Sequence, residues 1–201
     1  MPSVSKISID DLELKDRRIL VRVDFNVPLD GRGGITDDRR IQAALPTIRK
    51  ILIEGGRPVL MSHLGRPKGQ IRPELSLRPV ARRLEQLLDT PVAMAGDCIG
   101  AETAGLVAAQ KSGQTVLLEN LRFHPEETAN ETAFSQQLAS MGDSYVNDAF
   151  GTAHRAHAST VGVTRYLQPA AAGYLMKKEL DVLSRALTDP VSYTHLTLPT
   201  N

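Results

Sequence analysis

Short apolar runs alternate with longer amphipathic stretches along most of this chain. Runs of strand length occur at 19–23, 59–61, 116–118 and 145–146, with a weaker one at 91–94. Each is short, contains β-branched or aromatic residues and is bounded by turn-forming or polar residues. Stretches of helical character lie between them, at 40–54, 77–88, 101–109 and 131–141. This alternation predicts a parallel sheet with right-handed crossovers, that is, an open doubly wound α/β domain.

Composition and charge narrow the class of protein. Apolar residues make up 41% and charged residues 23%, as in ordinary soluble globular proteins. The formal net charge of +1 gives no general attraction to nucleic acid or to a membrane surface. Cys98 is the single cysteine, so an intramolecular disulfide is excluded and a reducing compartment is indicated. With no run of about 18 apolar residues and no signal-peptide core, we expect a cytoplasmic protein without nucleic-acid or membrane partners.

Positive charge is concentrated in one part of the chain. Residues 39–83 contain 11 Lys and Arg but only two acidic residues, Glu54 and Glu74. A nucleic-acid surface is disfavoured, because aromatic residues are only 4% of the chain and no stacking pattern accompanies the charges. One interpretation is a solvated helix face, which suits Arg78, Arg82 and Arg83. The other is a site for a small polyanion, which requires arginines at the ends of strands.

Polar residues follow four of the predicted strands directly. They lie in four separate segments, at 24–26, 62–66, 119–123 and 147–157. In a doubly wound sheet, ligands bind beyond the carboxyl ends of the strands, so these segments are expected to meet there. Arginine binds phosphate bidentately and keeps its charge. The pattern therefore predicts a site for a phosphorylated or multiply anionic small molecule, and Arg40, at the start of the first helix, can join it.

Five motifs make the sequence similar to a known family. They are residues 22–28 (RVDFNVP), 41–48 (IQAALPTI), 62–67 (SHLGRP), 118–123 (LENLRF) and 147–159 (NDAFGTAHRAHAS). In this order, from about residue 7 to about residue 190, they resemble the N-terminal, phosphoglycerate-binding domain of the phosphoglycerate kinase family.

The resemblance implies an activity and a division of labour. It implies a cytoplasmic monomer with two Rossmann-like lobes that performs a glycolytic reaction. The reaction is reversible phosphoryl transfer between 1,3-bisphosphoglycerate with ADP and 3-phosphoglycerate with ATP. The phosphoglycerate would bind to the lobe in this chain. Mg-ATP or Mg-ADP would bind to a second lobe, further along the chain than residue 201.

The resemblance also implies roles for individual residues. Arg40 corresponds to the family's catalytic arginine, which stabilises charge on the transferred phosphoryl group. This role is chemically reasonable, since phosphoryl transfer depends on positioning and charge neutralisation and needs no nucleophilic side chain. Asp24 and Asn26 are expected to hold the glycerate part of the substrate. The implied substrate-binding set comprises Asp24, Phe25, Asn26, Arg40, His63, Leu64, Gly65, Arg66, Arg122 and Arg155.

The C-terminal end departs from the family pattern. We expect one domain over 1–187, closed by a connector helix within 179–187, and a tail at 188–201 that does not match the family. Such a tail indicates a truncation or a sequence artefact, and the chain by itself is then expected to be inactive. Two alternatives stay open. One is a non-catalytic module that binds anionic small molecules, and the other is a basic surface for RNA or another protein.

A metal site is not expected from the sequence. His154 and His157 lie three residues apart, but no further ligand completes a zinc site at a fitting spacing. Cys98 is interpreted as a small buried or half-buried apolar residue.

Overall fold

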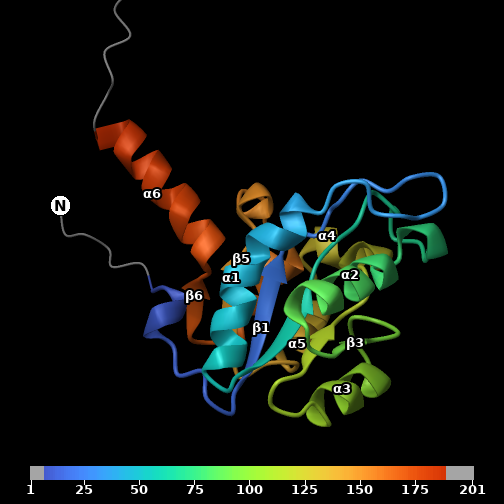
Figure 1. Ribbon diagram of the computed structural model, residues 1–201, viewed down its shortest axis with the longest axis horizontal. Helices are drawn as coiled ribbons and strands as arrows, with labels where there is room; N and C mark the ends of the chain where they lie inside the picture. Colours follow the sequence, from blue (N-terminus) through green and yellow to red (C-terminus); the bar gives the residue numbers. More distant parts are fainter. Residues whose placement is uncertain (1–6, 189–201) are drawn as a thin grey trace, which may run out of the picture.

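The computed structural model describes residues 7–188, with side chains described as far as residue 184. Six parallel strands form one sheet in the order β3-β4-β2-β1-β5-β6 (Figure 1). The strands are β1 (Arg18–Val23), β2 (Arg57–Met61), β3 (Val92–Met94), β4 (Thr115–Leu117), β5 (Ser144–Asp148) and β6 (Ala170–Ala172). The predicted parallel α/β sheet is confirmed.

Helices cover both faces of the sheet. They are α1 (Arg39–Ile53), α2 (Arg78–Leu88), α3 (Ala101–Ala108), α4 (Pro125–Ala129), α5 (Thr132–Ala139) and α6 (Tyr174–Thr188). Neighbouring residues of a strand point to opposite faces, so β1 contributes to two cores. Val21 packs in the core that α1 and α2 share, whereas Leu20 packs in the core with α3 and α5. The domain is therefore doubly wound, as the alternating pattern predicts.

Two elements were not expected from the sequence pattern. β6 consists of three alanines, which carry neither the β-branched bulk nor the alternation that marks a strand. It forms because its backbone pairs with β5, through Tyr145 with Ala170 and Asn147 with Ala172. α4 has only five residues, so no helical period is visible in its sequence.

The start of α2 is stabilised by Ser76 and by a residue from a distant segment of the chain. The helix begins at Arg78, and Leu77 occupies the N-cap position. The Ser76 hydroxyl accepts a hydrogen bond from Arg78 N at 3.2 Å, but Glu119 accepts from Leu77 N at 2.9 Å. Glu119 is distant in sequence, so this second partner is a tertiary feature that a local capping rule cannot supply.

β1 lies between β2 and β5 at the centre of the sheet. Val21 pairs with Leu60 on one side and with Val146 on the other. From β1 the chain adds strands first on the β2 side and later on the β5 side. The strand order therefore reverses at the β1/β5 boundary, and the crevice beyond the carboxyl ends of such strands is where this type of fold binds ligands.

α6 begins against the end of β5 and projects away from the body of the domain (Figure 1). Asp148 Oδ1, at the end of β5, accepts hydrogen bonds from Leu175 N at 2.8 Å and from Met176 N at 3.2 Å. Thr47 Oγ1 of α1 accepts one from Tyr174 N at 3.0 Å. The predicted connector region at 179–187 is thus part of a longer helix, and the expected tail lies outside the described residues from 189 onward.

In the described part of the chain, no helix has both the length and the apolar character needed to cross a membrane.

Candidate anion-binding site

A cavity of about 280 Å³ lies at the carboxyl ends of β1, β2, β4 and β5. Its lining residues come from the segments that follow these strands and from the first turn of α1. They are Asp24, Asn26, Arg40, His63, Gly65, Arg66, Gly151, Thr152, Arg122 and Arg155. The parallel sheet thus brings residues that are up to 131 positions apart into one polar pocket, as Asp24 and Arg155 show.

One side of the cavity is organised by hydrogen bonds between loops. Asn26 Oδ1 accepts from Gly65 N at 2.8 Å, and Gly65 O accepts from Arg122 Nη1 at 2.9 Å. Asp24 forms an ion pair with Arg40, with 2.5 Å between Oδ2 and Nη1. These contacts fix the loops after β1, β2 and β4 relative to one another. They also hold the Asp24 carboxylate next to Arg40. Most of the other charged side chains that line the cavity are arginines, so the cavity is rich in hydrogen-bond donors.

The cavity is also strongly cationic. Arg66, Arg122 and Arg155 all line the cavity. Burial lowers the pKa of Arg122, and the nearby Arg155 and Arg22 lower it further. A depressed arginine pKa means that the charged form lacks enough compensating negative charge in its surroundings. A bound anion supplies that charge, so the electrostatics of the cavity favour a phosphate or carboxylate ligand.

A second cavity, of about 380 Å³, adjoins the first through the same three arginines. Lys68, His124, Pro125, Thr128 and His157 are among its remaining lining residues. The three arginines therefore border both cavities.

His63 is held in its neutral form. Arg22 Nη2 lies 3.0 Å from His63 Nδ1, and because an arginine can only donate, Nδ1 must accept. The remaining proton of a neutral imidazole is then on Nε2, which leaves a donor for the cavity. Burial lowers the pKa of His63 to about 2, with Arg22 and Arg122 as the next causes. His63 therefore contributes a hydrogen-bond donor to the site and no charge.

We expect the pKa of His63 to make the protein less stable as the pH falls. In the folded state the pKa is about 2, against 6.5 for an ordinary histidine. Below 6.5 the unfolded chain takes up a proton that the folded protein does not, so the free energy of unfolding falls by up to ~1.4 kcal/mol per pH unit. The loss continues until the pH reaches the folded-state pKa.

Urea denaturation at about pH 7 and about pH 5 measures this effect. In His63→Gln the amide oxygen can still accept from Arg22, but the group does not titrate. The fall in stability should be smaller in His63→Gln than in the unmodified protein by ~2 kcal/mol. His157, whose pKa is also lowered by burial, is present in both proteins and cancels in the difference. Equal falls in the two proteins would show that His63 is protonated in the folded state.

A buried hydrogen-bond network holds Arg22, the hydrogen-bond partner of His63, in place. Arg22 has an exposed fraction of 1%, and its Nε donates to Ser159 Oγ at 3.0 Å. Ser159 Oγ donates in turn to Glu127 Oε1 at 2.6 Å, and Ser159 N donates to Glu127 Oε2 at 2.9 Å. Glu127 is equally buried, with an exposed fraction of 1%. The chain of contacts links β1, α4 and the segment after β5 beneath the cavity floor.

Asn120 holds the loop after β2 in place. Its Nδ2 donates to Leu64 O at 2.8 Å and to Leu75 O at 2.9 Å. Its Oδ1 accepts from Leu64 N at 3.2 Å and from Arg122 N at 3.1 Å. All four hydrogen bonds are to backbone atoms. The buried Asn120 amide therefore positions both the loop that carries Arg66 and the turn that carries Arg122.

The structure brings together eight of the ten residues that the sequence assigned to the site, because all but Phe25 and Leu64 line the cavity. Phe25 is fully buried and Leu64 is 2% exposed, and both side chains pack in the core with α1 and α2. Their backbone N–H groups already donate to Ser62 Oγ and Asn120 Oδ1. The structure therefore supports a packing role for these two residues, which hold the loops that carry their neighbours.

Sequence reasoning missed Gly151 and Thr152 as cavity residues, although both lie inside the motif at 147–159. It also missed Arg22 and Asn120, which stand inside quoted motifs but act through burial. Glu127 carries no local signal, since an acidic residue after a proline is typical of an exposed helix start.

Comparisons with known proteins agree on one family. The phosphoglycerate kinase family model matches residues 9–197. The chain is 61% identical over 187 residues to the phosphoglycerate kinase of Chlorobium luteolum, covering 93% of this chain and 47% of that protein. It is 59% identical over 186 residues to that of Chlorobaculum tepidum, covering 92% and 47%. The chain therefore spans about half the length of the curated relatives that it matches.

Solved structures show the same relationship. The phosphoglycerate kinase of Coxiella burnetii aligns with a TM-score of 0.80 at 41% identity, over 90% of this chain and 45% of that chain. The enzyme of Pyrococcus horikoshii aligns with a TM-score of 0.79 at 34% identity, with the same coverage. Since the family model covers nearly the whole chain and the fold agrees, this chain belongs to the phosphoglycerate kinase family.

Proposed function

We propose that this chain is the 3-phosphoglycerate-binding half of a phosphoglycerate kinase. The observation that carries the proposal is the cavity in which Arg66, Arg122 and Arg155 meet the Asp24–Arg40 ion pair beyond the carboxyl ends of four parallel strands. Three fixed positive charges suit a phosphate, and the amide of Asn26 and the Nε2 donor of His63 suit the hydroxyl and carboxylate of a glycerate. The match to phosphoglycerate kinases supports the same ligand.

In this function the chain binds and orients the acceptor. The carboxylate oxygen of 3-phosphoglycerate attacks the γ-phosphorus of ATP, and the bond from that phosphorus to the oxygen of ADP breaks, giving 1,3-bisphosphoglycerate and ADP. Arg40 is proposed as the catalytic arginine. Its side chain is 52% exposed at the rim of the cavity, a position from which it can reach charge on the transferred group.

Further parts of the proposal concern the rest of the protein. Mg-ATP or Mg-ADP binds a second lobe, which belongs to the half of the relatives' length that this chain does not span. The whole protein is proposed to act as a cytoplasmic monomer in glycolysis. The domain is proposed to cover 1–187 and so to end close to the end of α6 at Thr188, with 188–201 as a tail, of which the family model includes the part up to residue 197. Lacking the nucleotide lobe, this chain alone is proposed to bind the acid substrate without turnover.

Calorimetry and a coupled assay test the proposal on the 201-residue chain. We expect saturable binding of 3-phosphoglycerate that weakens as salt is added, and no turnover with magnesium, ATP and 3-phosphoglycerate above a mock preparation. Glycerate without its phosphate is the matched ligand control and should bind far more weakly. Turnover, or micromolar ATP binding, would place a nucleotide site within these residues. Binding of glycerate and 3-phosphoglycerate with equal affinity would refute the arginine site.

Fusion to the C-terminal half of a phosphoglycerate kinase distinguishes the kinase from the non-catalytic alternative. If this chain is half of a kinase, we expect the fusion to turn over 3-phosphoglycerate. Binding without turnover in a fusion that folds and binds ATP would favour the simple anion-binding module.

A further inference from the structure

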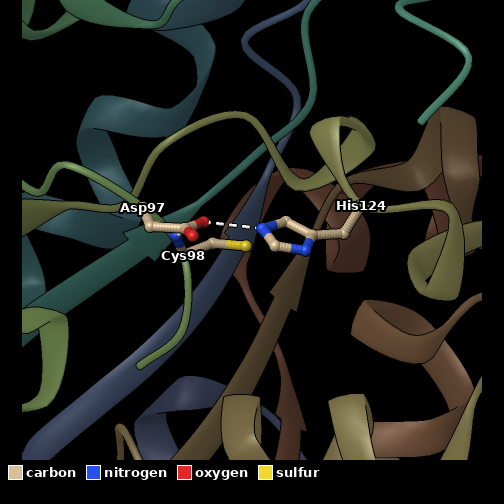
Figure 2. A group of neighbouring side chains, drawn as sticks. All are labelled: Asp97, Cys98 and His124. Carbon is tan, nitrogen blue, oxygen red and sulfur yellow. Dashed lines mark hydrogen bonds and ion pairs between the residues drawn. The ribbon is translucent and has the colours of Figure 1, made fainter. Parts of the chain in front are cut away.

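Asp97, Cys98 and His124 form a compact cluster of side chains on two different segments. Asp97 and Cys98 lie in the loop between β3 and α3, and His124 is the residue just before α4. Figure 2 shows the carboxylate, the thiol and the imidazole pointing toward one another. His124 borders the 380 Å³ cavity, but Asp97 and Cys98 line neither of the two arginine cavities, so the phosphoglycerate site does not explain the cluster as a whole.

The three side chains are close enough to share one ion. One ligand atom from each lies within 4.8 Å of the other two. Asp97 Oδ1 and His124 Nε2 are 2.7 Å apart. A tetrahedral zinc ion with its usual bond lengths separates its ligand atoms by roughly 3.4–3.6 Å. The Asp97–His124 contact therefore has to open by less than about 1 Å for an ion to replace the shared proton.

The three side chains differ in how far they are exposed to solvent. Cys98 is fully buried, whereas the side chains of His124 and Asp97 are 24% and 47% exposed. An ion can therefore enter from the carboxylate side and meet the sulfur at the closed end. The open side leaves a fourth position for water, as in zinc sites with three protein ligands.

Both ligand segments are already fixed by outer contacts. Asp97 O accepts from Thr103 Oγ1 at 3.1 Å, and Cys98 N donates to Asp97 Oδ1 at 2.6 Å. The His124 ring packs against Phe134, with 5.3 Å between ring centroids. A site whose ligands are held in this way loses little freedom when it binds an ion.

The second nitrogen of His124 also has a suitable partner. Glu126 Oε2 lies 4.0 Å from His124 Nδ1, and this oxygen is buried without a hydrogen bond to any residue in 7–188. Histidines that bind metals through one nitrogen usually donate the other N–H to a carboxylate. When Nε2 turns to an ion, Nδ1–H and the unpartnered Glu126 oxygen can form this pair.

A catalytic cysteine is a poorer explanation of the cluster. Cys98 is fully buried and lines neither of the two arginine cavities, so no substrate atom bound in them can reach its sulfur.

We propose that Asp97, Cys98 and His124 form a binding site for a thiophilic divalent cation of the zinc type. A thiolate, an imidazole and a carboxylate are the donors that zinc prefers, and water takes the fourth position. The bound ion ties the loop after β3 to the segment that follows Arg122. None of the three ligands lines the 280 Å³ cavity on which the proposed function rests, and only His124 lines the adjoining 380 Å³ cavity.

Titration of the untagged 201-residue chain with Co²⁺ tests the proposal. Tetrahedral cobalt bound to a thiolate gives a sulfur-to-metal charge-transfer band in the near ultraviolet and intense visible bands. We expect both at one equivalent, and their loss when Zn²⁺ is added. Cys98→Ala should remove the charge-transfer band, and His124→Asn should weaken binding at least ~10-fold. His154→Asn is the matched control and should bind as the unmodified chain does.

The thermal midpoint of unfolding is a second readout, which distinguishes a loss of zinc binding from a failure to fold. Zn²⁺ should raise the thermal midpoint of the unmodified chain and of His154→Asn, because an ion that binds only the folded state stabilises it. Cys98→Ser, nearly isosteric, should fold but show no such rise. The proposal is overturned if the chain shows no saturable cobalt spectrum, if the spectrum lacks the sulfur band, or if folded Cys98→Ser keeps the zinc-dependent rise.

Discussion

Glu127→Ala is expected to lower the free energy of unfolding by about 3–5 kcal/mol, which is the usual cost of removing one partner from a buried charged network. The Glu127 carboxylate accepts from both the N–H and the hydroxyl of Ser159. Its negative charge also acts on the fully buried Arg22 more strongly than that of any other acidic group. Alanine leaves the two Ser159 donors without an acceptor and the Arg22 charge without compensation, and both losses occur out of reach of water.

Urea denaturation measures this loss. Glu74→Ala is the control, since its side chain is 66% exposed and its truncation should change stability by no more than ~0.5 kcal/mol. Glu127→Gln keeps an acceptor for Ser159 but removes the charge, so its loss should fall between those of the two alanine variants. A loss below about 1 kcal/mol in Glu127→Ala would mean that water or a neighbouring group replaces the carboxylate, and that the network does not support the site.

Arg155→Ala and Arg66→Ala are each expected to weaken 3-phosphoglycerate binding by ~10–150-fold. A charge-assisted bidentate pair contributes about 1.5–3 kcal/mol, and both guanidinium groups line the cavity. Arg155→Lys should recover only part of the affinity, because an ammonium group cannot reproduce the planar fork. Titration calorimetry at constant ionic strength measures all three variants.

Arg165→Ala is the matched control for these arginine variants. Arg165 is exposed, lies in the short helix that follows residue 162, and lines neither arginine cavity, yet its loss changes the net charge by the same amount. The affinity of the Arg165→Ala variant for 3-phosphoglycerate should stay within about twofold of that of the unmodified chain. If Arg155→Ala and Arg165→Ala weakened binding equally, the effect would be one of overall charge, and Arg155 would not contact the ligand.

The fold class could be predicted because the strands carry their own signal. The runs at 19–21 and 59–61 are buried on both sides, and this forces a continuous apolar sequence. β6 gave no such signal, since Ala170–Ala172 is a strand through its backbone pairing with β5 and with Ser8. α4 is too short to show a period.

The composition of the cavity could be predicted for a topological reason. Parallel strands place their carboxyl ends at one edge, so polar residues after four strands had to meet. Phe25 and Leu64 show the limit of this reasoning, because contiguous motif residues alternate between the cavity and the core. Glu127 and Asn120 show another limit. Their importance comes from burial among distant segments, and nothing in their own neighbourhood in the sequence reports it.

The central position of β1 has a consequence for how the chain is made. One edge of β1 pairs with β2, which follows soon after it in the chain. The other edge must wait for β5, about 120 residues later, because β5 begins only at Ser144. At ~5–20 residues per second, a ribosome needs roughly 6–24 s to deliver that partner. During this interval the nascent chain presents an open, apolar strand edge, which is the kind of surface that invites aggregation. The strand made first thus waits longest for its second partner, and the period of greatest risk ends when β5 emerges.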